Sequence, residues 1–158
     1  MWVVSSLVLA TSARATFHLM QIEQVIGGVN GDTTAQAVQL RMRASLQNLV
    51  QNGRLVVRDA TGANPLILVQ PSTSVLNSSA GDRVLLVTSN FVSTTGPAVV
   101  PDFYMTNSIP PTYLAAGRLT WEDTVGTVLW AVSWGGTNYT GPVTCSTLND
   151  DNGTNGPA

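Results

Sequence analysis

The sequence of 158 residues carries little charge and has no lysine. Charged residues make up 10% of it, against about 25% in an average globular protein. All seven basic residues are arginines, the formal net charge is −2, and no basic cluster exceeds the pair Arg41 and Arg43. A nucleic-acid-binding protein needs a basic face that makes several phosphate contacts. The composition therefore argues against nucleic acid as a partner.

Histidine, cysteine and glutamate are nearly absent. With His18 and Cys145 the only residues of their kinds, we expect neither an intrachain disulfide nor a zinc site. His18 has no nucleophile motif near it, which leaves no basis for a Ser–His–Asp or Cys–His mechanism. The only glutamates, Glu23 and Glu122, are candidates for a glycosidase carboxylate pair, but Glu122 occupies the polar face of a strand pattern and Glu23 lies on the same face as Gln21. We predict no enzymatic activity and no cofactor.

What the sequence does contain is a repeated alternation of apolar and polar residues between short turns. Alternation of period two, as in 37–43 and 127–134, is typical of strands that bury one face and expose the other. Its recurrence along the chain predicts an all-β, antiparallel protein with a single core. The residues expected in that core are Val38, Leu40, Leu55, Val57, Leu86, Trp121, Trp130 and Trp134.

Clusters of Gly, Asn, Ser and Pro divide the pattern into separate strands. The nearly continuous apolar run 83–88 is typical of a strand in the middle of a sheet, and Met20, Ile22 and Ile26 are expected on one face of the first strand. The Pro-bearing segments 93–101 and 108–117 are predicted as loops. Strands are predicted over 17–26, 36–44, from Leu55 onward, and over 66–69, 83–88, 118–123 and 127–134, with 103–105 as an edge strand.

The tryptophans allow two interpretations. Trp121, Trp130 and Trp134 could form an aromatic platform for sugars, which would make the chain a carbohydrate-binding module. Trp130 and Trp134 share a face with Val132, however, as core residues do. Burying about 150–250 Å² per ring contributes roughly 4–6 kcal/mol before the entropy cost, at about 25 cal/mol per Å². The core interpretation is favoured, and a solvent-facing Trp would favour the other.

Two strand ends carry the same turn motif, Asp-x-x-Gly. Asp59 stands three residues before Gly62, and Asp123 three residues before Gly126. An Asp side chain can close an Asx-turn on its own backbone, and Gly adopts a positive φ without steric cost. The motif therefore predicts two hairpin turns rather than an acidic metal site.

Residues 1–15 have the features of a secretory signal peptide. The short apolar stretch 2–10 (WVVSSLVLA) precedes Ala13-Arg14-Ala15, which has small residues at the two positions a cleavage site needs, although the usual basic residue before the stretch is missing. The stretch is too short to cross a bilayer as a helix. We predict that the mature chain begins near Thr16, has no membrane span, and is extracellular or held at the cell surface.

The composition changes again from Gly135 onward, where apolar residues become few and no period remains. Residues 137–158 are predicted as a flexible linker or as the truncated end of a domain, which places the domain itself at 16–136. The segment 150–156 (DDNGTNG) resembles a calcium loop but lacks the complete ligand register and the distal Glu. The linker interpretation is therefore favoured.

Read in order, these segments resemble the lamin tail domain of bacterial extracellular proteins. The matching segments are 21–25 (QIEQV), 37–42, 55–62 with its Asp-x-x-Gly, 83–90 (RVLLVTSN) after a Gly-Asp turn, and 119–134. Ala37 or Gln39 stands where the family carries an acidic residue. The resemblance implies an immunoglobulin-like β-sandwich without catalytic residues, which binds an unidentified protein or surface partner. A carbohydrate-binding accessory module is the alternative function.

Overall fold

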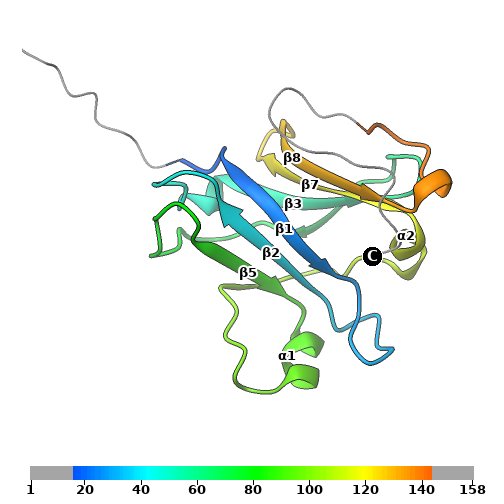
Figure 1. Ribbon diagram of the computed structural model, residues 1–158, viewed down its shortest axis with the longest axis horizontal. Helices are drawn as coiled ribbons and strands as arrows, with labels where there is room; N and C mark the ends of the chain where they lie inside the picture. The colour runs from blue at the N-terminus through cyan, green and yellow to red at the C-terminus, as the bar shows by residue number, and fades with distance from the viewer. Residues whose placement is uncertain (1–15, 144–158) are drawn as a thin grey trace, which may run out of the picture.

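The computed structural model describes residues 16–143, which form two four-stranded sheets packed into a β-sandwich (Figure 1). The predicted β-sandwich is therefore confirmed, with two short helices added. The strands are β1 (Met20–Ile26), β2 (Ala37–Met42), β3 (Gly53–Arg58), β4 (Leu66–Val69), β5 (Arg83–Val87), β6 (Phe103–Tyr104), β7 (Gly117–Asp123) and β8 (Val128–Trp134). The helices are α1 (Ser89–Thr95) and α2 (Pro111–Ala115), with 3-10 turns η1 (Val50–Asn52) and η2 (Gly136–Asn138).

The first sheet has the strand order β1-β2-β5-β6 and the second β4-β3-β7-β8. Every pair is antiparallel except β5 and β6, which run parallel with Leu86 opposite Phe103. The prediction of purely antiparallel sheets is wrong at this pair. A parallel neighbour requires a long crossover connection, and the chain supplies one through α1. The run predicted as a central strand is confirmed as such, since β5 lies between β2 and β6.

Helix α1 replaces part of a predicted loop. Thr88 caps its N-terminus, accepting a hydrogen bond from Phe91 N–H at 3.3 Å. The side chain of Phe91 is buried against Ala37 and Val87, so α1 covers part of the outer face of the first sheet. Its Ser, Asn and Thr residues have low intrinsic helix propensity, which is why the sequence pattern did not indicate a helix. The cap and the burial of one aromatic ring hold it instead.

The first strand contains an irregularity that changes which side chains face the core. A β-bulge lies between Ile22 and Gln24, opposite Leu40 and Gln39 of β2. Because the extra residue inverts the alternation beyond it, Met20 and Ile22 belong to the main core whereas Ile26 packs with the cluster under α1. The prediction that these three residues share one face is wrong for Ile26.

The main core lies between the two sheets and contains all eight residues listed above for it. Trp121 is completely buried, and Trp134 and Trp130 retain only 3% and 8% of their surface. Trp121 Nε1 donates to Phe17 O at 3.0 Å and Trp134 Nε1 donates to Tyr113 O at 2.8 Å. Both indole N–H groups therefore have partners inside the fold, as a buried Trp requires.

Candidate functional site

The carboxylate oxygens of the described aspartates accept hydrogen bonds from the backbone. Each accepts a hydrogen bond from at least one backbone N–H, at distances between 2.7 and 3.1 Å. These residues are Asp32, Asp59, Asp82, Asp102 and Asp123. Carboxylates bound in this way hold turns and strand ends.

Asp59 is the clearest example of a carboxylate that holds a turn through hydrogen bonds. Its Oδ1 accepts from Thr61 N–H at 2.8 Å and Ala63 N–H at 3.1 Å, and its Oδ2 accepts from Asn64 Nδ2 at 2.6 Å. Hydrogen bonds to the ionised form, led by the Thr61 hydroxyl, lower the pKa of Asp59 from 3.8 to about 2. Gly62 takes a φ of +75°, the conformation that this turn requires.

Asp123 builds the second turn in the same way. Its Oδ1 accepts from Val125 N–H at 3.0 Å and Thr127 N–H at 2.7 Å, and Gly126 has a φ of +100°. Burial raises the pKa of Asp123, but the hydrogen bonds from Thr127, Val125 and Gly126 outweigh it and lower the pKa overall. The structure thus places all four predicted turn residues in two matching hairpin turns.

The two glutamates lie in different sheets, Glu23 in β1 and Glu122 in β7. Glu23 in β1 binds Arg83, whose Nε lies 2.7 Å from Oε2, and this hydrogen bond lowers the pKa of Glu23. Glu122 in β7 is fully buried and binds Arg54 at 3.1 Å and Arg58 at 2.6 Å. Both carboxylates are engaged by arginines of their own sheet.

The predicted polar face of β7 is not exposed to solvent. Arg118, Thr120 and Glu122 alternate with the core residues of this strand, yet all three are buried. Thr120 Oγ1 lies 2.7 Å from Glu122 Oε1 and 2.7 Å from Arg58 Nη1. The aliphatic stems of arginines can cover a sheet face while their charged ends bind a buried carboxylate. Alternation therefore predicted which face each residue occupies, but not that both faces would be buried.

The other residues considered for metal binding or catalysis are not grouped into a site within the described part of the chain. Over residues 16–143 no group of three or more His, Cys, Asp and Glu side chains is arranged to hold a metal ion. The ring of His18 packs against that of Phe17, with centroids 4.3 Å apart. Within the same range, no helix has the length and apolar character needed to cross a membrane. Cys145 and the calcium-loop-like segment 150–156 lie outside the described residues.

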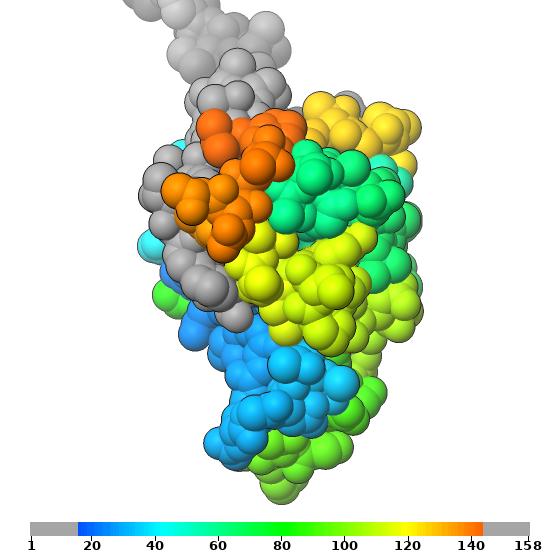
Figure 2. Space-filling model, turned by 90° about the vertical axis from the view of Figure 1, so that its right-hand side faces the viewer, coloured from blue at the N-terminus to red at the C-terminus, as the bar shows by residue number. Residues whose placement is uncertain are grey.

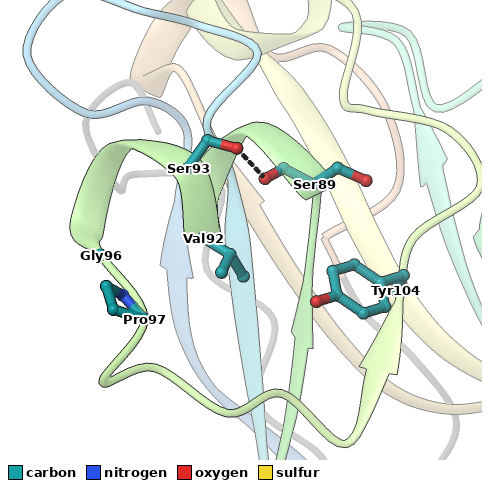
Figure 3. A pocket seen from close by; sticks show the side chains of 6 residues that line it. All are labelled: Ser89, Val92, Ser93, Gly96, Pro97 and Tyr104. Carbon is teal, nitrogen blue, oxygen red and sulfur yellow. Dashed lines mark hydrogen bonds between the residues drawn. The ribbon is translucent and has the colours of Figure 1, made fainter.

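A different kind of site lies along strand β6, at the edge of the first sheet. A hollow of about 440 Å³ opens between α1 and β6, lined by Ser89, Val92, Ser93, Gly96, Pro97 and Tyr104 (Figure 3). A second hollow of about 310 Å³ is lined by Phe103, Asp102 and the loop residues 73–77. Because neighbouring strand residues point to opposite sides, Phe103 and Tyr104 each contribute to a different hollow.

Exposed apolar side chains gather along this edge. Leu76 is 100% exposed, Val100 81% and Tyr104 54%. Leu76 lines the second hollow, Tyr104 lines the first, and Val100 lies in the connection that leads into β6. We call Leu76, Val100, Phe103 and Tyr104 the β6 edge surface. Tyr104 lies on one side of β6, and Leu76 with the partly buried Phe103 on the other. Exposed apolar residues next to an edge strand are typical of an interaction site.

The backbone holds β6 firmly in this position. Asp102 N–H donates to Leu85 O at 2.9 Å, and Leu85 N–H donates back to Asp102 Oδ2 at 2.7 Å. Beyond β6, Thr106 N–H and Asn107 N–H donate to Leu68 O of β4 at 2.8 and 3.2 Å. The strand is thus fixed to β5 at its start and to the other sheet after its end. An anchored strand loses less conformational entropy than a loose one when it binds a partner.

The sequence pattern does not indicate this surface. It predicted an edge strand at 103–105 but assigned Leu76 and Val100 to Ser-, Asn- and Pro-rich loops without a role. The available signal was the presence of single large apolar residues within such loops, next to a predicted edge strand. The folded arrangement was needed to show that the loops meet at β6.

No protein-family model matches this chain, and no curated protein matches it either.

Proposed function

We propose that this chain is an exported, non-enzymatic β-sandwich domain of the lamin tail type, with immunoglobulin-like topology, that binds a protein or surface partner outside the cell. The observation that carries the proposal is the β6 edge surface, where Leu76, Val100 and Tyr104 expose apolar area beside two hollows. The described carboxylates, by contrast, are engaged in turns and ion pairs. Binding rather than catalysis is what this arrangement supports.

The export part of the proposal is supported at the start of the described structure. Thr16 N–H donates to Leu46 O at 2.5 Å and Thr16 Oγ1 donates to Gln47 Oε1 at 2.7 Å. Phe17, the next residue, is buried in the core. Cleavage after Ala15 would therefore leave a domain whose first residue is already bonded to it.

A carbohydrate-binding module is the second candidate. Trp121, Trp130 and Trp134 are buried, so none of them offers a platform for a sugar ring. The half-exposed ring of Tyr104 beside the hydroxyl groups of Ser89 and Ser93 is the observation that favours this candidate. Any sugar site would then lie on the β6 edge surface and not on the tryptophans.

The test compares Tyr104→Ser and Leu76→Ser with a control, Val125→Ser, which removes another exposed apolar residue, from the Asp123 turn. We expect the native chain and the control to be exported, to begin at Thr16, and to stay with the cell surface or matrix. The Tyr104 and Leu76 variants should be exported in the same amount but released into the medium. Equal retention of all variants, or an intact Met1 on a cytosolic protein, would contradict the proposal. Retardation in a neutral polysaccharide gel that depends on Tyr104 would favour the second candidate.

A further inference from the structure

Tyr104 is the residue whose peptide groups form the free edge of β6. Met105 N–H donates to Val87 O at 2.7 Å, so the peptide groups of Phe103 and Met105 are turned toward β5. Successive residues of a strand turn their N–H and C=O groups to alternate sides, which directs those of Tyr104 away from β5. Because β6 is the last strand of its sheet, no strand or loop among residues 16–143 bonds to them.

This free edge is only one residue long. Pro101 has no N–H, and Thr106, the next residue beyond β6 that turns outward, already donates to Leu68 O at 2.8 Å. One residue of an incoming antiparallel strand can exchange both hydrogen bonds with Tyr104, as closely paired residues of such strands do. Main-chain bonding can therefore set the register of a bound segment, while side-chain contacts have to supply most of the affinity.

The two hollows beside β6 are placed to receive those side chains. They are lined from opposite sides of the strand, one by Tyr104 and the other by Phe103. A strand added to this edge would direct its side chains alternately to the same two sides. The residue directly opposite Tyr104 would lie on the side of the first hollow, and its neighbours in sequence on the side of the second.

The first hollow fits an aliphatic side chain. Val92, Pro97 and the ring of Tyr104 give it apolar walls, and Gly96 adds no side chain (Figure 3). The hydroxyl group of Ser93 also faces this space, but it already donates to the carbonyl oxygen of Ser89 at 3.1 Å. An apolar group loses no hydrogen bond when it enters such a site.

The α1 wall of this hollow is held in place from its far side by the turn that precedes β2. Asn90 Nδ2 donates to Thr34 Oγ1 at 2.6 Å, and Thr88 Oγ1 donates to Thr34 O at 2.7 Å. Figure 2 shows this turn, in light blue, lying against the green of α1 at the lower end of the molecule. The hollow is thus formed before a partner arrives, which lowers the entropy cost of binding.

The second hollow combines an apolar surface with a negative charge. The fully exposed Leu76 and the ring of Phe103 line it together with Asp102. One carboxylate oxygen of Asp102, Oδ2, accepts from Leu85 N–H, and no arginine within residues 16–143 forms an ion pair with this carboxylate. Lys and Arg side chains have an apolar stem and a cationic end. A basic side chain therefore matches both parts of this hollow.

We propose that an extended segment of another protein adds to β6 as an antiparallel strand, with an aliphatic residue opposite Tyr104 and an adjacent Lys or Arg placed between Leu76 and Asp102. This mode of binding is β-strand addition, in which main-chain bonds set the register and alternate side chains give specificity. The proposal rests on the proposed function, whose partner it describes. Charge complementarity with Asp102 favours this occupant over a second copy of the chain, because the β6 edge surface of a copy has no basic residue.

The experiment titrates the full, isotope-labelled chain with short acetylated peptides in which a central Val is flanked by Lys and then by Thr on both sides. We expect the peptide to shift the NMR signal of the Tyr104 amide and to protect that amide from exchange with solvent. Methylating the backbone nitrogen of the central Val removes the donor to Tyr104 O and should weaken binding about three- to ten-fold. Replacing both Lys residues by Gln should weaken it about two- to five-fold.

Two variants of the chain test the charged part of the site. Asp102→Asn keeps an acceptor for Leu85 N–H and should abolish the difference between the Lys and Gln peptides. The control Asp59→Asn removes the same charge from the β3–β4 turn and should preserve that difference.

Strand addition would be overturned if the Lys peptide failed to bind, if Tyr104 N–H stayed unprotected at saturation, or if the methylated peptide bound as tightly as its parent. Release of the Tyr104→Ser and Leu76→Ser variants from the cell surface would in that case leave the proposed function intact. Equal retention of those variants and the native chain would instead refute the proposed function itself.

Discussion

Replacing Trp130 by alanine is the most direct test of how this sandwich is held together. The ring is 92% buried between the sheets, in the same cluster as Val38 and Leu40 of the opposite sheet. Arg43 lies over its face, with the guanidinium carbon 5.2 Å from the ring centre. Loss of a buried Trp costs about 3–5 kcal/mol, and loss of the cation–π contact adds roughly 0.5–1 kcal/mol. We expect the free energy of unfolding to fall by about 4 kcal/mol.

Urea or guanidinium unfolding of the full chain measures this change, with Val125→Ala as the control. Val125 is 86% exposed, and its truncation should change the free energy of unfolding by less than about 0.5 kcal/mol. Because the substitution changes stability and not the extent of surface exposed on unfolding, the slope of the transition should stay the same while its midpoint falls. If stability fell by less than about 1 kcal/mol and sugar binding were lost as well, Trp130 would not be a core residue. The interpretation as a carbohydrate platform would then be favoured.

Further predictions concern the turns and the buried carboxylate. Gly62→Val and Gly126→Val should each cost about 1–2 kcal/mol or more in thermal or denaturant unfolding, because Val disfavours their positive φ; unchanged stability would contradict the turn assignment. Asp59→Asn should be mild at neutral pH. Since folding lowers the pKa of Asp59 from 3.8 to about 2, its contribution is complete above pH 3.8 and is lost as the pH falls toward 2, so acid titrations of the native chain and Asp59→Asn should converge there. Glu122→Gln should cost about 3–5 kcal/mol, whereas Glu23→Gln, whose side chain is 23% exposed, should cost less than about 1 kcal/mol in the same assay.

The elements that the sequence predicts well are those whose signal is local. β4 and β7 match their predicted positions within a residue because alternation and turn residues define them. The two Asp-x-x-Gly turns follow from the chemistry of two residues each. The eight core residues follow from the same alternation, since a strand face rich in Val, Leu and Trp has to be buried.

What escapes prediction depends on contacts between distant segments. One extra residue in β1 sends Ile26 to the opposite face, and no pattern in 20–26 marks it. The parallel pairing of β6 is decided by the crossover through α1. Burial of Glu122 depends on two arginines of β3, 68 and 64 residues away in the sequence. The β6 edge surface likewise exists only because the loops that carry Leu76 and Val100 lie beside β6.

The bonds from the 106–107 segment to β4 bear on how the protein behaves at high concentration. β4 is an edge strand, its Ile67 is 39% exposed, and an open edge of this kind is a template for pairing with strands of other molecules. Thr106 and Asn107 occupy Leu68 O, and Asn107 Nδ2 donates to Ile67 O at 2.9 Å. Two successive carbonyl groups are thus closed to incoming strands. The same short segment that positions β6 therefore also covers part of the β4 edge against pairing with a strand of another molecule.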